Sequence, residues 1–248
     1  MTEHEKEKRF AEKIKASKNI VFFGGAGVST ESGMKDYRSK DGIYSAVKEY
    51  GIPPETILSH DFLMQNPETF YKFYAEYFLG KSAKPNKAHK ALARLEEMGK
   101  VKAVITQNID GLHQAAGSKN VIELHGTTSL YYCTKCGAPF PKEEVEHLNG
   151  AVPYCSCGAF VRPRVTMYGE MLDTQAEDRA ISALSAADML IVGGTSLAVY
   201  PAAAYLHFFK GDTVAVINRD ETFMDKNSDF VFRDKIGDVF KRVMELLD

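Results

Sequence analysis

Short apolar runs alternate with amphipathic stretches along most of the 248-residue chain. The apolar runs predict buried strands at 19–23, 101–106, 121–124, 189–192 and 213–217. Apolar residues recurring at every third and fourth position predict helices at 3–16, 88–95, 174–186, 201–209 and 236–247. Strands that alternate with helices are typical of parallel β-α-β units, so we predict an α/β fold on a doubly wound, Rossmann-like parallel sheet.

One stretch between the first two predicted strands shows no strand pattern. Its aromatic residues recur at the spacing of one helix face, which predicts a core-facing helix. These aromatic residues are Phe70, Phe73, Tyr74, Tyr77 and Phe78. The stretch is therefore interpreted as a helical insertion into the parallel sheet.

The four cysteines of the chain lie close together in sequence. Cys133 and Cys136 are separated by two residues, and Cys155 and Cys157 by one. Two such pairs predict one zinc ion, and four thiolates fill its tetrahedral shell, so the zinc would be structural. The short second pair leaves His147 as an alternative ligand in place of one cysteine.

The two insertions define a predicted division of the single catalytic unit 1–248. A large Rossmann-like domain would comprise about 1–34, 82–128 and 166–248. A smaller domain would be built from the helical insertion, about 35–81, and the zinc-binding insertion, about 129–165.

Composition narrows the choice of partners and compartment. The chain is 44% hydrophobic and 26% charged, with a formal net charge of -2, which is typical of a globular protein and predicts no nucleic-acid partner. The charged N-terminus lacks the apolar region of a signal peptide, and no apolar run is long enough to span a membrane. We expect a cytoplasmic monomer with no membrane partner.

A glycine-rich loop, Gly24 to Gly33, follows the first predicted strand directly. Such a loop lets backbone N–H groups approach a pyrophosphate, and a following helix N-terminus would add a partial positive charge. Thr30 replaces the third glycine of the dehydrogenase fingerprint, and no acidic residue ends a second strand about 20 residues on. The loop therefore predicts a dinucleotide site and argues against hydride transfer.

Polar or glycine-rich residues also follow the other predicted strands, where ligands of such sheets bind. Gln107-Asn108-Ile109-Asp110 offers two amides and a carboxylate, and His125 has the pKa range of a general base. The nearby His113 is interpreted as structural.

Taken together and in order, these segments resemble the sirtuins. The matching motifs are Gly25 to Ser29, Ser32-Gly33, Asp36 to Arg38, Gln107 to Asp110, His125-Gly126, the two cysteine pairs, Arg162-Pro163, Tyr168 to Glu170, Gly194 to Ser196 and Ile217-Asn218. The resemblance runs from about residue 18 to residue 244.

The resemblance implies an NAD-dependent protein-lysine deacetylase or deacylase that consumes NAD. Its products would be nicotinamide, the deacylated lysine and O-acyl-ADP-ribose, and its partners acyl-lysine proteins or peptides. By position, His125 would be the catalytic base, Asn108 would orient the ribose and water, and Asp110 would hold the nicotinamide carboxamide.

The resemblance also implies which residues bind each substrate. The NAD contacts would be Gly25, Ala26, Gly27, Thr30, Tyr37, Arg38, Gln107, Ile109, Asp110, Gly194, Thr195, Ser196, Asn218, Arg219 and Ile236. The acyl-lysine peptide would add as a strand between two loops and contact Val165, Thr166, Tyr168, Gly169, Glu170, Leu197 and Ala198.

The chain departs from the family pattern at several positions. Lys35 stands where proline is usual, and Thr166 and Tyr168 add hydroxyls near the acyl-lysine tunnel. Tyr71 is followed three residues later by Tyr74, where desuccinylases carry arginine, so we predict neutral acyl groups.

Two alternatives to deacylation stay open at this point. On the same fold, the chain would be an ADP-ribosyltransferase or an NAD glycohydrolase. From a different class, it would be a non-catalytic nucleotide-binding protein with a zinc ribbon.

Overall fold

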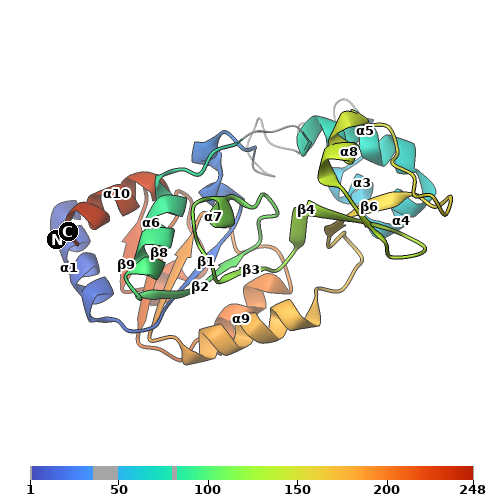
Figure 1. Cartoon of the computed structure of the whole chain (residues 1–248). Helices are drawn as coiled ribbons and strands as arrows, with labels where there is room; N and C mark the ends of the chain where they lie inside the picture. Colours follow the sequence, from blue (N-terminus) through green and yellow to red (C-terminus); the bar gives the residue numbers. More distant parts are fainter. Residues whose placement is uncertain (1, 36–49, 80–82, 248) are drawn as a thin grey trace.

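The computed structural model describes residues 2–35, 50–79 and 83–247, and its centre is a six-stranded parallel sheet (Figure 1). The strands lie in the order β3-β2-β1-β7-β8-β9. Their bounds are β1 Ile20–Gly24, β2 Val101–Thr106, β3 Val121–Glu123, β7 Met189–Gly193, β8 Thr213–Ile217 and β9 Phe230–Phe232. The chain runs outward from β1 in one direction and from β7 in the other, so the topological switch point lies between β1 and β7. The predicted doubly wound sheet is confirmed.

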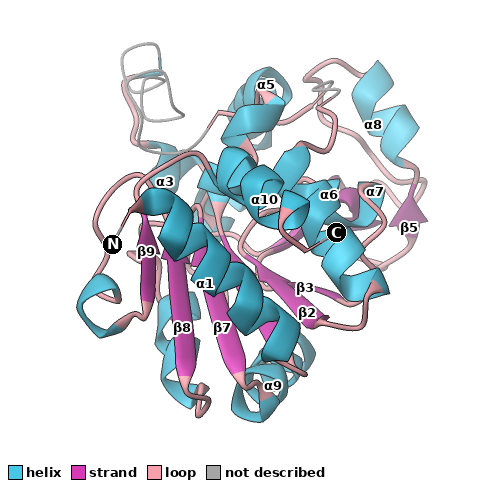
Figure 2. Cartoon of the chain, turned by 90° about the vertical axis from the view of Figure 1, so that its left-hand side faces the viewer, coloured by secondary structure: helices cyan, strands magenta, loops and turns pink. Residues whose placement is uncertain are grey.

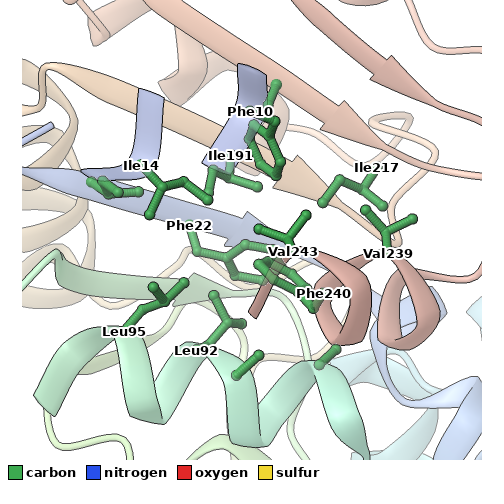
Figure 3. Packing of buried hydrophobic residues seen from close by; sticks show 14 of the residues in the cluster. Phe10, Ile14, Phe22, Leu92, Leu95, Ile191, Ile217, Val239, Phe240 and Val243 are labelled. Carbon is green, nitrogen blue, oxygen red and sulfur yellow. The ribbon is translucent and has the colours of Figure 1, made fainter. Parts of the chain in front are cut away.

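Side chains of β1 alternate between two cores, one on each face of the sheet. Ile20 and Phe22 belong to one core, Val21 and Phe23 to the other, and all four are fully buried. The first core also contains residues of the helices α1 (Glu3–Ala16), α6 (Lys87–Glu97) and α10 (Ile236–Glu245), as Figure 3 shows for Ile14, Leu92 and Phe240. The second core is closed by α9 (Thr174–Ala186) and the 3-10 helix η4 (Ala202–Phe208). Burial on both faces explains why β1 consists of a continuous apolar run.

A second, three-stranded sheet lies to one side of the parallel sheet, where Figure 1 shows β4 and β6 among short helices. Its strands are β4 (Gly126–Cys133), β5 (Pro139–Phe140) and β6 (Val161–Val165). The helices near it are α3 (Pro54–Ile57), α4 (His60–Gln65), α5 (Pro67–Tyr77) and α8 (Lys142–His147).

Aromatic side chains of α5 form a third core with these strands. Phe70, Tyr71, Phe73 and Tyr74 are buried against a group that includes Tyr131 of β4. The predicted core-facing helix and the zinc-ribbon insertion are therefore present, while the residue limits of the two domains stay a prediction.

Some elements differ from the sequence-based prediction. The segment after β1, interpreted from the sequence as a glycine-rich loop, contains two short 3-10 helices, η1 (Ala26–Val28) and η2 (Thr30–Ser32). The helix predicted at 201–209 is the 3-10 helix η4, because the apolar spacing does not distinguish the two helix types. β9 was not predicted because its three residues are too few for a periodic pattern.

The remaining short elements are α7 (Leu112–Ala115) and η5 (Asp225–Asn227). Figure 2 views the molecule from the left-hand side of Figure 1, the side on which both chain ends lie, with α1 in front of β7 and β8. Within the described ranges, no helix has the length and apolar character needed to cross a bilayer.

Candidate functional site

Two glycine loops meet in direct backbone contact at the switch point of the sheet. The Gly27 N–H, after β1, donates a hydrogen bond of 2.8 Å to the Gly194 carbonyl, after β7. A Cβ on Gly27 would lie only 2.8 Å from Gly194 Cα, and Gly194 itself has φ of 59°. Both positions therefore need glycine, because a side chain at either would force the loops apart.

Gly25 leaves room for two polar side chains beside this contact. A Cβ on Gly25 would lie 3.0 Å from both Gln107 Oε1 and Thr195 Cβ. Thr195 Oγ1 donates to Gln107 Oε1 at 3.3 Å, whereas Gln107 Nε2 is buried and meets no acceptor among the described residues. A buried donor without a protein partner costs free energy unless a ligand satisfies it, so Gln107 Nε2 fits a ribose hydroxyl or similar acceptor.

Ser29 joins the glycine loop to the polar loop that follows β2. Its Oγ donates to Asp110 Oδ2 at 2.6 Å and accepts from Asn108 Nδ2 at 3.1 Å. Asp110 Oδ1 also accepts the Leu112 N–H at 2.9 Å, and the Asn108 N–H donates to Thr106 Oγ1 at 3.0 Å. The amide and the carboxylate are therefore fixed in orientation. Ser29 lies within a matched motif, but its contact with Asp110 joins positions 81 apart and is not predictable from the sequence.

His125 lies shortly after β3 and contacts the same loop. Its Nδ1–H donates to the Gln107 carbonyl at 2.9 Å, which leaves Nε2 as the ring nitrogen with a lone pair. Burial lowers the pKa of His125. The imidazole is therefore neutral near pH 7 and held in the tautomer that accepts a proton through Nε2.

Three of the predicted NAD contacts, Thr30, Arg219 and Ile236, lie around η2 and the start of α10. Arg219 Nη2 donates to Thr30 Oγ1 at 3.2 Å, and Thr30 Oγ1 donates to the Gly27 carbonyl at 3.0 Å. Ile236 begins α10 and packs closely enough that a Cβ on Gly193 would lie 2.4 Å from its Cδ1.

The structure describes three further predicted NAD contacts, and two others lie outside the described residues. Ala26 begins η1, and Ser196 follows Thr195 directly on the loop after β7. Asn218 follows β8, and its side chain donates to the Asp220 carbonyl at 2.9 Å. Tyr37 and Arg38 lie outside the described residues, so their predicted roles stay predictions.

A small apolar cavity adjoins the polar loop. It has a volume of about 40 Å³ and is lined by Leu58, Tyr74, Phe78, Ile109, Val165, Thr166, Met167 and Tyr168. Ile109 of the predicted NAD loop thus shares a cavity with three predicted substrate residues. The other four line no part of it: Gly169 and Glu170 follow it in the chain, and Leu197 and Ala198 lie on the loop after β7.

The four cysteines converge on one point beside β4. Their sulfur atoms all lie within 4.8 Å of one another, with Cys133 and Cys157 at 3.4 Å and Cys136 and Cys155 at 3.7 Å. This all-thiolate set fits a structural zinc with no open coordination position. His147 is not part of the cluster; its Nδ1–H donates to the Glu143 carbonyl at 2.6 Å, so the alternative ligand is wrong.

A larger groove of about 460 Å³ lies elsewhere, between α9 and the strands β2 and β3. None of the predicted site residues lines it. The chemistry predicted from the sequence therefore gathers at the carboxyl ends of the strands and not in this groove.

Two histidines lie buried behind the polar loop. The rings of His89 on α6 and His113 on α7 are 4.7 Å apart, and neither nitrogen of His113 has a partner among the described residues. Burial lowers the pKa of His89 to about 4 and that of His113 to about 3. Both rings are therefore neutral in the folded protein, which agrees with a structural role for His113.

Comparison with known proteins gives a consistent picture. The sequence model of the Sir2 family matches residues 25–201. An NAD-dependent protein deacetylase of Clostridium acetobutylicum is 49% identical over 232 residues, which cover 93% of this chain and 95% of that protein. One of Clostridium tetani is 48% identical over 241 residues, covering 97% and 98%.

Solved structures agree with the sequence comparison. A complex of Sir2 with a p53 peptide and NAD+ has a TM-score of 0.86 and 39% identity, covering 96% of this chain and 97% of that one. A Sir2 complex with a deacetylated p53 peptide and 3'-O-acetyl ADP ribose has a TM-score of 0.88 and 40% identity, with the same coverage.

The cysteine cluster predicts the metal content of variants. Cys157→Ser removes one of four thiolates, so zinc should be lost and the melting temperature should fall, because a structural zinc contributes folding free energy. Metal analysis and thermal unfolding measure both effects. His147→Ala is the matched control and should keep about one zinc per chain. Full zinc retention by Cys157→Ser would contradict the four-cysteine site.

The buried histidine pair predicts loss of stability in acid. Unfolded histidine titrates near 6.5, above the folded pKa values of about 4 and about 3, so the unfolded chain binds more protons below pH 6.5. Each histidine should then lower the free energy of unfolding by up to about 1.4 kcal/mol for each pH unit below 6.5. Urea unfolding between about pH 7.5 and pH 5 measures this slope.

His113→Leu should make that slope shallower, since one titrating group is removed. The exposed His207 provides the control, and His207→Ala should leave the slope as in the wild type. An unchanged slope in His113→Leu would show that the pair does not titrate as described.

Proposed function

The chain belongs to the Sir2 family, and we propose that it is an NAD-dependent protein-lysine deacylase whose active site is the polar loop 107–110 with His125. The relatives named NAD-dependent protein deacetylase cover nearly the whole chain, which supports transfer of the activity. When bound, NAD supplies the ADP-ribosyl group that accepts the acyl group, with release of nicotinamide. The partners are acyl-lysine proteins or peptides, and we propose that the chain acts as a monomer.

The buried Gln107 Nε2 is the observation that most strongly supports the proposed NAD site. It is a donor without a protein partner, and it lies beside Gly25 and Thr195 at the switch point. A dinucleotide lying over the two glycine loops would place a ribose hydroxyl within reach of such a donor. Thr30 and Arg219 would then lie on the pyrophosphate and adenosine side.

His125 is the proposed base. Its Nδ1–H is committed to the Gln107 carbonyl, so Nε2 receives the proton of a ribose hydroxyl. The lowered pKa keeps this nitrogen unprotonated at neutral pH, as a general base requires.

Asn108 and Asp110 are proposed to orient the ribose and the nicotinamide carboxamide. Ser29 holds both side chains through its single hydroxyl, so neither has to be ordered when the substrate binds. Preorganised polar groups of this kind favour the transition state, because no reorganisation is needed during the reaction. Ile109 lies between them in sequence and lines the apolar cavity, which excludes water from one side of the reacting bond.

Replacement of His125 by alanine tests the proposal. His125→Ala should lower deacylation of an acetyl-lysine peptide by about two to four orders of magnitude, the usual contribution of a general base. NAD binding and zinc content should persist, because the backbone contacts of the glycine loops and the cysteine cluster are untouched. Mass spectrometry of the products reads deacylated peptide and O-acetyl-ADP-ribose.

The exposed His207 provides the control, and His207→Ala should retain full activity. ADP-ribosylated protein, or free ADP-ribose formed without loss of the peptide's acetyl group, would favour the ADP-ribosyltransferase or NAD glycohydrolase alternative. Turnover unchanged in His125→Ala would contradict the assigned base, and no turnover by the wild type would favour a non-catalytic nucleotide-binding protein.

The apolar cavity supports the prediction of neutral acyl groups. Its eight lining residues, all within the described ranges, include no charged side chain. The hydroxyl of Tyr74, where desuccinylases carry arginine, is hydrogen-bonded to Tyr131 at 3.0 Å, and Tyr71 donates to the Val161 carbonyl at 2.5 Å. A carboxylate on the acyl chain would therefore find no cationic partner there.

Acyl preference can be measured with a matched peptide series. Acetyl, propionyl and butyryl peptides should be deacylated at least about tenfold faster than a succinyl peptide, because an unpaired carboxylate in an apolar cavity costs more than about 1.4 kcal/mol. Tyr168→Phe removes one hydroxyl at the cavity and should change the order among the neutral chains. Efficient desuccinylation, or identical profiles for Tyr168→Phe and the wild type, would contradict these two expectations respectively.

A further inference from the structure

The carboxylate of Glu170 forms a salt bridge with a buried arginine. Arg162 of β6 is 5% exposed, and its Nη1 and Nη2 donate to the two carboxylate oxygens of Glu170 at 2.5 and 2.9 Å. The Met167 N–H donates to Oε2 at 2.8 Å. Burial acts to raise the pKa of Glu170, but these hydrogen bonds outweigh it and hold the pKa at about 2. Glu170 is thus a carboxylate at any physiological pH.

His60 reaches the same carboxylate from a different part of the chain. It is the first residue of α4, and its Nδ1–H donates to Glu170 Oε1 at 2.8 Å. Its backbone N–H donates to the Tyr168 carbonyl, and the Tyr168 N–H donates to the Leu58 carbonyl, both at 3.0 Å. The turn between α3 and α4 therefore runs beside residues 168–170 like a short parallel strand, and His60 closes that pairing with a side-chain contact.

The location of this pairing gives it a consequence for substrate binding. Tyr168 and Leu58, whose backbones share one of these hydrogen bonds, both line the apolar cavity. The segment that follows, Gly169 to Met171, is one of the two loops between which the acyl-lysine peptide is proposed to add as a strand, and it is called the docking loop here. A backbone segment pairs well with a peptide strand only if its N–H and C=O groups are held in place. Gly169, with φ of 88°, has the conformational freedom of glycine, so its neighbours must fix the backbone there.

We propose that His60 is a positioning residue for the acyl-lysine peptide. Through its hydrogen bond to Glu170, His60 holds the docking loop 169–171 in place. The inference rests on the proposed deacylase function. His60 touches neither the NAD loops nor the reacting groups in the described contacts, so it should act on peptide binding alone.

The exposure of His60 makes its role separable from folding. Its side chain is 44% exposed, so its removal leaves Glu170 still paired with Arg162 and buries no unpaired charge. Removal of Arg162 would leave a partly buried carboxylate without its main partner and would destabilise the fold. His60 is therefore the better residue to replace.

Steady-state kinetics with an acetyl-lysine peptide and NAD test the inference. His60→Ala should raise the peptide KM about three- to tenfold, since a partly exposed, charge-assisted hydrogen bond is lost. The kcat at saturating peptide and the KM for NAD should stay within about twofold. His60→Asn should restore much of the peptide KM, because Asn Nδ2 can occupy the place of His Nδ1. Gln65→Ala, at the exposed far end of α4, is the control and should match the wild type.

Peptide binding measured by fluorescence anisotropy gives a readout that does not need turnover. An unchanged peptide KM and Kd in His60→Ala would overturn the inference while leaving the deacylase function standing. A fall in kcat, a raised KM for NAD or a failed rescue by His60→Asn would show a general structural role and overturn it too. A wild type that binds the peptide without deacylating it would refute the proposed function, and the variant's Kd would still decide the role of His60.

Discussion

The site depends on one backbone contact, the hydrogen bond between Gly27 and Gly194 at the switch point of the sheet. It joins the loops after β1 and β7, the two strands from which the chain winds outward in opposite directions. Because a Cβ on Gly27 would lie 2.8 Å from Gly194 Cα, the distance between the loops is set by the absence of side chains. Thr195 and Gln107 lie beside this contact, and Thr30 is hydrogen-bonded to the Gly27 carbonyl.

Hydrogen bonds also join the glycine loop after β1, the polar loop after β2 and the proposed base. Ser29, just after η1, holds Asp110 and Asn108, and the Gln107 carbonyl in the same loop holds His125. The Ile109 carbonyl accepts both the N–H and the hydroxyl of Thr128 on β4. Ser29, His125 and Thr128 thus all bind the loop after β2. Loss of any one of these contacts would let the loop move relative to the other two residues.

The sequence predicted the parallel sheet and most of this site because both follow local patterns. Strands such as β1 and β7 are continuous apolar runs, and the polar residues follow them directly. The role of Ser29, the pairing of His60 with Glu170 and the three-stranded sheet were not predicted, because each joins segments far apart in the chain. His60 and Glu170 are 110 positions apart, and no periodicity along the sequence marks such a contact.

The two ends of the site are built by different means, and this bears on which substrates they accept. The NAD end rests on backbone contacts between glycine loops, which any side chain would disrupt, so its ligand is narrowly fixed. The proposed acyl and peptide end combines side chains of the inserted segments, among them Leu58, Tyr74 and His60, with Thr166, Met167 and Tyr168, which lie outside the insertions. Side chains at the acyl and peptide end can change without moving the parallel sheet. The reason is that the third core is separate from the two cores that cover the faces of that sheet. Changes in the insertions can therefore alter the proposed preference for acyl chain and peptide while the proposed NAD site at the strand ends keeps its geometry.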